Sequence, residues 1–233
     1  MKEIEDRELL ASYLHSHQLD RVFEESLRPH LALYSYDQGE AICTQGEPSE
    51  IMYVLVKGKV KVFTTSPEGK TLVVCFKTAL EVVGDIEYVQ GTEIINTVEA
   101  VSPTHMIGIH YRWLNKYNSD HAPFLQFLLK IITQKFYLKS SSMSFNMLYP
   151  VEVRLASYLL AVFFDETDPL FWGRLRTSDL TDVANLIGTS YRHLNRVILK
   201  FCSQGLIERT KDGIIVKNRQ GLQNLALRNI YEY

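Results

Sequence analysis

The stretch from residue 177 to residue 217 constrains the fold more than any other part of the chain, because it predicts two short helices and a hairpin in immediate succession. The first helix is expected to begin at Asp179, whose carboxylate can cap a free backbone N–H of the first turn. Its apolar side chains recur at helical spacing and form one buried face: Leu180, Val183, Ala184 and Ile187. Gly188 ends this helix, and the chain restarts at Thr189 and Ser190.

Ser190 is a favourable N-cap for the second helix, which is expected to have two distinct faces. The inward face carries Leu194, Val197, Ile198 and Phe201. The outward face carries Tyr191, Arg192, Asn195, Arg196 and Lys200. Arginine, amide and phenol groups on an exposed helix can bind base edges, and cations can bind phosphates, so this face predicts DNA recognition.

A hairpin is predicted directly after the second helix. Gly205 ends the helix, and the apolar runs 206–207 and 214–216 lie on either side of Lys211-Asp212-Gly213. Asp-Gly supplies the positive φ angles of a tight hairpin turn. Two helices and a hairpin in this order predict a winged helix-turn-helix.

The distribution of charge supports a nucleic-acid partner. Residues 174–220 contain nine Lys/Arg and four Asp/Glu, whereas residues 1–120 contain eleven Lys/Arg and eighteen Asp/Glu. A basic segment in a chain of net charge −2 is what phosphate binding requires. One alternative is a ligand-sensing interaction module whose winged helix contacts a protein partner. Its outward face would then be apolar, and only Tyr191 comes close.

The N-terminal half has a different pattern. Residues 1–29 predict a helical lead, and residues 30–120 predict a jelly roll, that is, a double-stranded β-helix, from short β-rich runs between glycines. Strands are expected at residues 41–43, 52–56, 60–64, 71–76, 94–98 and 105–110. Metal-dependent enzymes with this fold need two histidines at positions i and i+2 of a strand, so that both point to the same face. His105 and His110 are five apart, on opposite faces, so we expect neither an enzyme nor a resident metal or cofactor.

A long helix is predicted from about Pro123 onward, within residues 121–149. Six positions recur there at alternating spacings of three and four. One of them is Lys139, and we expect the five apolar ones to form a dimerisation seam: Leu125, Leu129, Ile132, Phe136 and Met143. This face could instead pack on the roll. A second apolar face, Phe124, Phe127, Leu128 and Ile131, can do that, which favours a homodimer. Pro150 favours a hinge, after which residues 150–233 form the winged domain of an α+β chain.

The cysteine content and the lengths of the apolar stretches bear on the metal chemistry and the cellular location of the protein. Cys43, Cys75 and Cys202 are the three cysteines, and their spacing matches neither a disulfide framework nor a zinc site. No charged leader precedes an apolar run, and the longest apolar stretch, residues 158–164, is too short to cross a bilayer. A cytoplasmic protein that makes no membrane contact is expected.

In this order of roll, long helix and winged helix, the chain resembles the Crp/Fnr superfamily of bacterial transcription regulators over nearly its whole length. The motifs that carry the resemblance are Gly39-Glu40, Gly46-Glu47, residues 52–58, Pro67-Glu68-Gly69-Lys70, Gly84-Asp85, and residues 186–190 with Arg196. Residues 190–194 and 216–219 resemble the YeiL-like branch of this superfamily.

The resemblance implies an effector site in the roll, and its residues can be compared one by one. Members that bind cyclic AMP carry Gly-Glu, whose acid holds the ribose, and Arg-Ser, whose arginine neutralises the phosphate. Gly84 and Asp85 match the first pair, but Ile94 and Ile95 stand at the second, so a buried phosphate would have no cation. We expect no response to cyclic AMP, and Asp85 to be a turn residue or cap. Effector-helix positions fall near Lys139 and Ser140.

Other sensor chemistries of the superfamily fit less well. An iron–sulfur sensor needs four cysteines, and a haem sensor needs an axial ligand, for which His105, His110 and His121 are nominal candidates. The roll is expected to hold an unknown small-molecule effector that is uncharged or anionic, to report a protein partner, or to bind nothing.

The resemblance also implies a homodimer on a palindromic double-stranded DNA site, and contact with RNA polymerase if the protein is an activator. Tyr191, Arg192 and Arg196 are the candidates for base contact. Ser190, His193, Lys200 and Lys211 are the candidates for phosphate contact.

Overall fold

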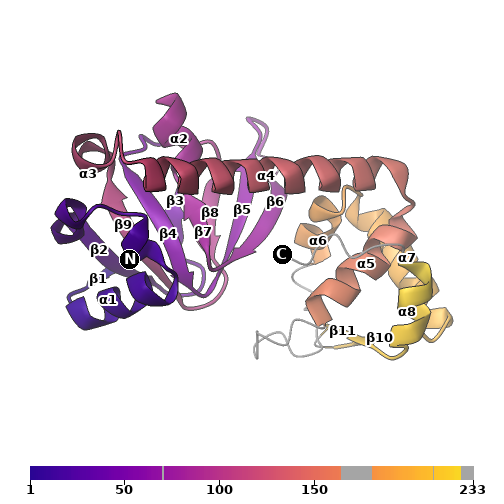
Figure 1. Cartoon of the computed structure of the whole chain (residues 1–233). Helices are drawn as coiled ribbons and strands as arrows, with labels where there is room; N and C mark the ends of the chain where they lie inside the picture. Colours follow the sequence, from indigo (N-terminus) through magenta and orange to yellow (C-terminus); the bar gives the residue numbers. More distant parts are fainter. Residues whose placement is uncertain (70, 164–179, 212, 227–233) are drawn as a thin grey trace. The chain divides into compact units, whose positions relative to one another are not determined.

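The computed structural model describes residues 1–69, 71–163, 180–211 and 213–226 (Figure 1). The chain divides into two compact units, Met1–Phe136 and Tyr137–Tyr233. The long helix α4 (Ala122–Leu148) contributes residues to both units. Each unit has its own apolar core, as expected of parts that fold around separate clusters of buried side chains.

The first unit is a roll of two antiparallel sheets, which confirms the predicted α+β fold and β-roll. The five-stranded sheet has the order β1 (Lys2–Ile4), β2 (Leu31–Tyr36), β9 (Thr104–His110), β4 (Ile51–Lys57) and β7 (Glu81–Val83). The four-stranded sheet has the order β3 (Ala41–Cys43), β8 (Thr97–Ala100), β5 (Lys59–Thr65) and β6 (Thr71–Thr78). In the pair β4–β9, Val54 lies opposite Ile107, and both side chains are fully buried.

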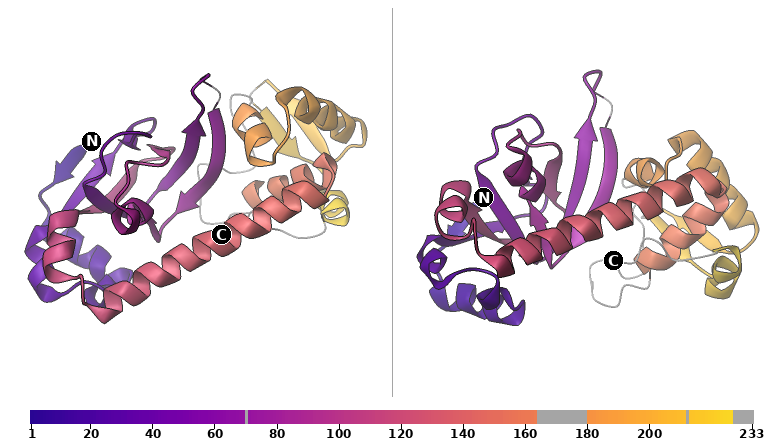
Figure 2. Two further views of the ribbon diagram at one scale, coloured as in Figure 1. Left: turned by 90° about the horizontal axis from the view of Figure 1, so that it is seen from above. Right: turned by 45° about the horizontal axis from the view of Figure 1, so that its top comes forward.

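Short helices surround this roll: α1 (Arg7–Ser16), the 3-10 turns η1 (Leu19–Arg21) and η2 (Glu25–His30), α2 (Asp85–Gln90) and α3 (Tyr111–Tyr117). The N-terminal half of α4 packs on the same core through Phe124, Leu128 and Ile131. These are residues of the predicted docking face. Figure 2 shows α4 in two further views as one long, continuous helix. Among the described helices, none is both long enough and apolar enough to span a bilayer.

Two predictions for the first unit were wrong in detail. The N-terminal lead is not wholly helical, because residues 2–4 form strand β1, with Lys2 opposite Ser35. Three residues without apolar alternation give no strand signal by themselves. The strand expected at 94–98 begins only at Thr97, because Ile94 bonds to the loop at Gly46 and Glu47.

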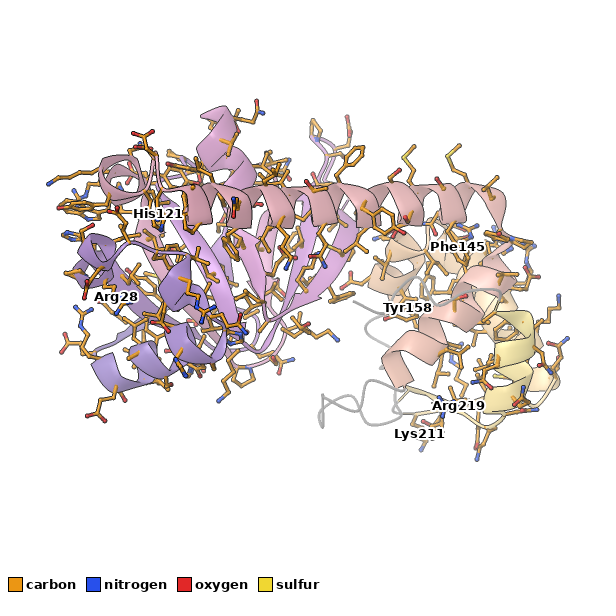
Figure 3. The ribbon with its side chains drawn as sticks, viewed as in Figure 1. Arg28, His121, Phe145, Tyr158, Lys211 and Arg219 are labelled. Carbon is orange, nitrogen blue, oxygen red and sulfur yellow. The ribbon has the colours of Figure 1, made fainter. Side chains whose placement is uncertain are left out.

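The second unit contains α5 (Val151–Phe163), α6 (Leu180–Leu186), α7 (Tyr191–Ser203), β10 (Ile207–Thr210), β11 (Gly213–Val216) and α8 (Arg219–Leu225). Figure 3 labels Tyr158 on α5 and Lys211 at the turn between β10 and β11. The predicted cap Asp179 and the turn residue Asp212 lie outside the described residues. Helix α8 was not predicted, and its Leu222 is fully buried in the core of this unit.

Candidate DNA interface and effector region

A buried arginine holds the turn between α6 and α7. The side chain of Arg154, on α5, donates hydrogen bonds from Nη1 to the carbonyl oxygens of Ile187 and of Gly188, the latter at 3.1 Å. Gly188 has a φ of +66°, where residues with a side chain are strained. The N–H of Thr189 closes the turn by donating to the carbonyl of Ala184 at 2.8 Å. The start of α7 is therefore fixed relative to α5 and α6.

Helix α7 has the two faces that the sequence predicts. The Ser190 hydroxyl caps it by accepting a hydrogen bond from the N–H of His193 at 3.2 Å. The inward side chains Leu194, Val197, Ile198 and Phe201 are all buried. Tyr191, Arg192 and Arg196 are exposed, while His193 is half-buried. A rigidly capped helix thus presents two arginines and a phenol to solvent.

The cations of α7 differ in whether they form ion pairs. Arg192 and Arg196 form no ion pair with any residue in the described part of the chain. Lys200, predicted to contact phosphate, instead pairs with Glu152 of α5 at 3.1 Å. The Glu152 carboxyl accepts a hydrogen bond from its own backbone N–H and another from Lys200. These two bonds keep its pKa below the usual value. Arg192 and Arg196 are therefore the cations of α7 that are available to a ligand.

The hairpin β10–β11 is the predicted wing, with Ile207 opposite Val216. Arg209 of β10 donates a hydrogen bond from Nη1 to Oδ1 of Asn195 on α7 at 2.9 Å. This contact joins the wing to α7 through the amide of Asn195, which was predicted to lie on the outward face. Lys211, at the tip, is exposed.

The effector region lies around the β7–α2 junction in the first unit. Gly84 has a φ of +87°, and a Cβ there would lie 2.9 Å from the Ile51 carbonyl oxygen. The Tyr111 hydroxyl donates to the Gly84 carbonyl at 2.7 Å, so Ser49, at 2.6 Å, must donate to the Tyr111 oxygen. Burial raises the pKa of Tyr111 to about 12, which keeps its proton in place at neutral pH. The junction therefore has a fixed shape.

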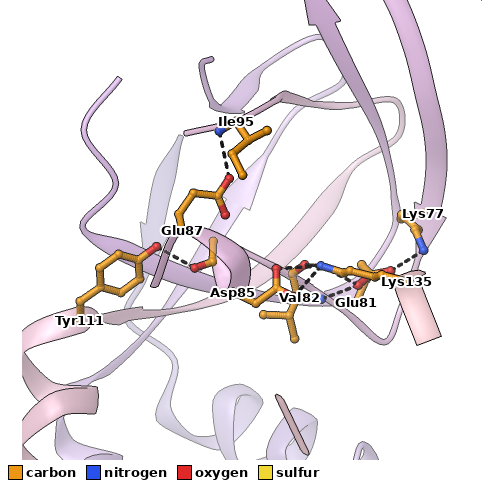
Figure 4. A network of polar contacts seen from close by, with 9 residues as sticks. Lys77, Glu81, Val82, Asp85, Glu87, Ile95, Tyr111 and Lys135 are labelled. Carbon is orange, nitrogen blue, oxygen red and sulfur yellow. Dashed lines mark hydrogen bonds and ion pairs between the residues drawn. The ribbon is translucent and has the colours of Figure 1, made fainter. Parts of the chain in front are cut away.

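Asp85 has a cationic partner, which corrects the prediction that it is merely a turn residue or cap. It is the first residue of α2, only 2% exposed, and both carboxylate oxygens accept hydrogen bonds from Lys135 of α4, at 2.8 and 2.9 Å (Figure 4). Lys135 also donates to the Val82 carbonyl at 2.7 Å and lies 3.3 Å from a carboxylate oxygen of Glu81. Lys77 lies 2.7 Å from the other Glu81 oxygen. Two lysines and two carboxylates thus form one charge-balanced cluster.

The pKa shifts agree with ionised partners in this cluster. Burial alone would lower the pKa of Lys135, but Asp85 and Glu81 hold it above its usual value. Burial alone would raise the pKa of Glu81, but Lys135 and Lys77 hold it below its usual value. Both shifts favour the charged forms at neutral pH.

The other candidate effector residues take no part in this cluster of charged side chains. The N–H of Ile95 donates to the buried carboxylate of Glu87 at 3.0 Å, and the Ile95 side chain is 43% exposed. The N–H of Ile94 donates to the Glu47 carbonyl at 2.9 Å. Gly84, Asp85 and Ile95 therefore share one neighbourhood around α2. Lys139 and Ser140 are exposed on α4, in the part that belongs to the second unit.

The predicted dimerisation seam is largely exposed. Four of its five side chains are open to solvent in the isolated chain, and Ile132 is half-buried: Leu125 46%, Leu129 67%, Phe136 74% and Met143 63% exposed. Tyr137 and Met147 of α4 are exposed as well. An apolar surface of this extent along one helix is uncommon on a monomer.

The histidines proposed as nominal haem ligands have partners in the protein. His105 lies 2.9 Å from the Tyr13 hydroxyl, His110 accepts a hydrogen bond from the N–H of Arg112 at 3.3 Å, and His121 lies 4.0 Å from Glu24. Within the described ranges, no group of three or more histidines, cysteines or acidic residues is placed to hold a metal ion. The cysteines are half-buried thiols.

Two important residues were missed at the sequence level, Lys135 and Arg154. Each had a signal, because each is a cation in an otherwise apolar pattern. Lys135 follows Phe124, Leu128 and Ile131 at helical spacing on the docking face of α4. Arg154 stands in the apolar helix α5. A cation on a buried face indicates a buried acceptor, but the sequence does not say which one.

Comparison with known proteins places these features in a family. The cyclic nucleotide-binding domain model matches residues 33–117, and the Crp-like helix-turn-helix domain model matches residues 153–225. The regulatory protein YeiL of Escherichia coli O157:H7 is 26% identical over 195 residues, covering 84% of this chain and 85% of that protein. A CRP-like cAMP-activated global transcriptional regulator of Mycobacterium tuberculosis is 20% identical, covering 86% of this chain and 91% of that protein.

Solved structures show the same fold. A Crp/Fnr-family regulator from Eubacterium rectale superposes with a TM-score of 0.76 at 17% identity, covering 92% of this chain and 98% of that one. The c-di-GMP responsive regulator CLP of Xanthomonas campestris gives 0.69 at 18% identity, covering 81% and 94%. The matched families and relatives are transcription regulators rather than enzymes. With a cyclic nucleotide-binding domain followed by a Crp-like helix-turn-helix domain, the chain belongs to the Crp/Fnr family of transcription regulators.

Proposed function

We propose that the protein binds double-stranded DNA sequence-specifically as a homodimer and regulates transcription from that site. The observation that carries the proposal is the exposed face of α7, where Arg192 and Arg196 form no ion pair with the described residues and Tyr191 lies beside them. A capped helix with this face fits the major groove, where an arginine can bind guanine through two hydrogen bonds.

The phosphate contacts of the proposal come from the ends of the motif. Ser190 and the half-buried His193 lie at the start of α7, and Lys211 lies at the tip of the wing. Lys200 is a weaker candidate than the sequence suggests, because Glu152 engages it. Contacts of this kind fix the register of a protein on the duplex without reading its sequence.

The dimer is supported by the exposed seam of α4. Pairing two copies of Leu125, Leu129, Phe136 and Met143 would remove these side chains from water. Twofold symmetry would then place two α7 helices about one DNA turn apart, roughly 34 Å, on a palindromic site. As an activator, such a dimer would also contact RNA polymerase, and its place of action would be the bacterial cytoplasm.

Cyclic AMP is not the proposed effector, although the mycobacterial relative is named as cAMP-activated. Asp85, at the position that would hold a ribose, is already bonded to Lys135. Ile94 and Ile95 offer no side-chain cation or hydroxyl to a phosphate, so burying one there would leave its charge without a partner. An uncharged small molecule or a protein partner fits the roll better.

Selection of bound oligonucleotides from a random pool tests the function. We expect a palindromic consensus whose affinity falls steeply with salt, because phosphate contacts release counterions. A protein-binding winged helix would give no consensus and a weak salt dependence, which would support the interaction-module alternative.

Sedimentation tests the dimer separately. Leu129→Glu places a carboxylate in the exposed seam and should produce a monomer, whereas Gln126→Glu, an exposed polar position of the same helix, should leave the dimer intact. A wild-type protein that sediments as a monomer at the concentrations used for DNA binding would rule out the proposed assembly.

A further inference from the structure

Lys135 has no remaining capacity to bind a ligand. An ammonium group has three N–H donors. The acceptors around Nζ are the Val82 carbonyl at 2.7 Å, the Asp85 carboxylate at 2.8 and 2.9 Å and Glu81 at 3.3 Å. These acceptors come from β7 and the first residue of α2, whereas Lys135 comes from α4 (Figure 4). One side chain therefore joins the long helix to the effector region.

The charges within the cluster also balance. Asp85 and Glu81 are offset by Lys135 and Lys77, and both carboxylates are almost fully buried. The adjacent buried carboxylate, Glu87, takes its hydrogen bond from the backbone N–H of Ile95. An incoming anion would therefore approach carboxylates and find the nearby ammonium donors in use.

We propose that Lys135 acts as an internal ligand of the roll, which holds α4 on the β7–α2 junction without any small molecule and excludes nucleotide effectors from this place. The effect of Lys135 on operator binding rests on the proposed function. Phe136 directly follows Lys135 and belongs to the exposed seam. The contact that fixes Lys135 therefore also fixes the proposed dimer surface, and operator binding needs no nucleotide.

The matched variants are Lys135→Met and Lys130→Met, which make the same change at a half-buried position that is paired with carboxylates and at an exposed position of α4. Affinity for the selected operator is measured where both proteins are fully folded. We expect Lys135→Met to bind at least tenfold more weakly and Lys130→Met to remain within twofold of the wild type. Equal affinity of the folded Lys135→Met protein would overturn the proposal, and so would a wild-type protein whose operator affinity rises on adding cyclic AMP or cyclic GMP.

Hydrogen exchange of the ligand-free wild-type protein decides the matter if Lys135→Met does not fold. The amides of residues 131–136 and of β7 should exchange as slowly as those of β4, the interior strand that pairs with β7. Rapid exchange in either segment would show that nothing holds them together and would overturn the proposal. Because this measurement needs no DNA, it is independent of the proposed DNA binding, which fails if the wild-type protein binds no oligonucleotide selectively.

Discussion

The cations of the roll and those of α7 contrast in the partners that they have. In the first unit, Lys135 and Lys77 lie against the buried carboxylates Glu81 and Asp85. In the second unit, Arg192 and Arg196 are exposed and form no ion pair with the described residues. A cation held against buried carboxylates stabilises a local arrangement, whereas an exposed cation without an ion-pair partner is available to an external anion. The two regions thus use the same kind of side chain for opposite purposes.

The largest effect is expected from breaking the buried cluster. Lys135→Met leaves Asp85 and part of Glu81 uncompensated, which should reduce the free energy of unfolding of the first unit by about 3–5 kcal/mol. The measurement is urea unfolding followed by the fluorescence of Trp113, with the other tryptophan, Trp172, replaced by phenylalanine. A loss below about 1 kcal/mol, typical of a surface pair, would mean that the cluster is solvated.

The same loss should depend on pH. Because the folded pKa of Glu81 is lowered, its contribution to stability is present above the unfolded value of about 4.3 and is lost as the pH falls through the folded pKa. The raised pKa of Lys135 gives a contribution that is present below about 10.4 and is lost as the pH rises through the folded pKa. Lys77 and Lys135 face Glu81, and Asp85 faces Lys135, in the ion pairs of the described residues. The difference between wild type and Lys135→Met should therefore be largest between these limits and shrink below about pH 4.

Removing an available cation of α7 should have the next largest effect. Arg196→Ala should weaken binding to the selected operator by about 1–3 kcal/mol and relax the preference at one base position. Lys211→Ala is the control, because a phosphate contact at the wing should weaken all sequences alike. An Arg196→Ala protein with an unchanged consensus would show that this arginine does not read a base.

The N-cap of α7 should have a moderate effect on stability. Ser190→Ala removes the acceptor of the His193 N–H, which should cost about 0.5–2 kcal/mol of the free energy of unfolding. Ser190→Asp retains a capping oxygen but adds a negative charge, so we expect near-normal thermal unfolding by circular dichroism and weaker DNA binding. Normal DNA binding by Ser190→Asp would place the phosphates away from this end of the helix.

The smallest effect is expected at the pair Glu152–Lys200, where a partnered cation can be converted into an available one. Glu152→Gln removes the partner of a half-exposed lysine, and such pairs contribute about 0–1 kcal/mol to stability. If Lys200 then reaches phosphate, the salt dependence of operator binding should steepen by about one unit of slope. An unchanged slope would place Lys200 outside the DNA interface.

Local patterns were enough to predict much of α7 and the roll. The buried set Leu194, Val197, Ile198 and Phe201 follows directly from helical spacing, and Ser190 caps the helix as its residue type suggests. Strand β1 and the true start of β8 were not predicted, because each depends on a partner distant in sequence: Ser35 for Lys2, and Glu47 for Ile94. Spacing does not encode such partners.

For the candidate sites, the sequence by itself determined that α7 exposes Tyr191, Arg192 and Arg196, because a periodic apolar face leaves the opposite face to solvent. It also determined that Ile94 and Ile95 bring no cation to the effector region. Only the tertiary structure decided that Lys200 pairs with Glu152, that Arg154 holds the turn before α7, and that Asp85 is bonded to Lys135. The partners of Lys200, Arg154 and Asp85 lie 48, 34 and 50 residues away along the chain, so they meet only when the chain folds and burial forces each charge to find an acceptor or a counter-ion.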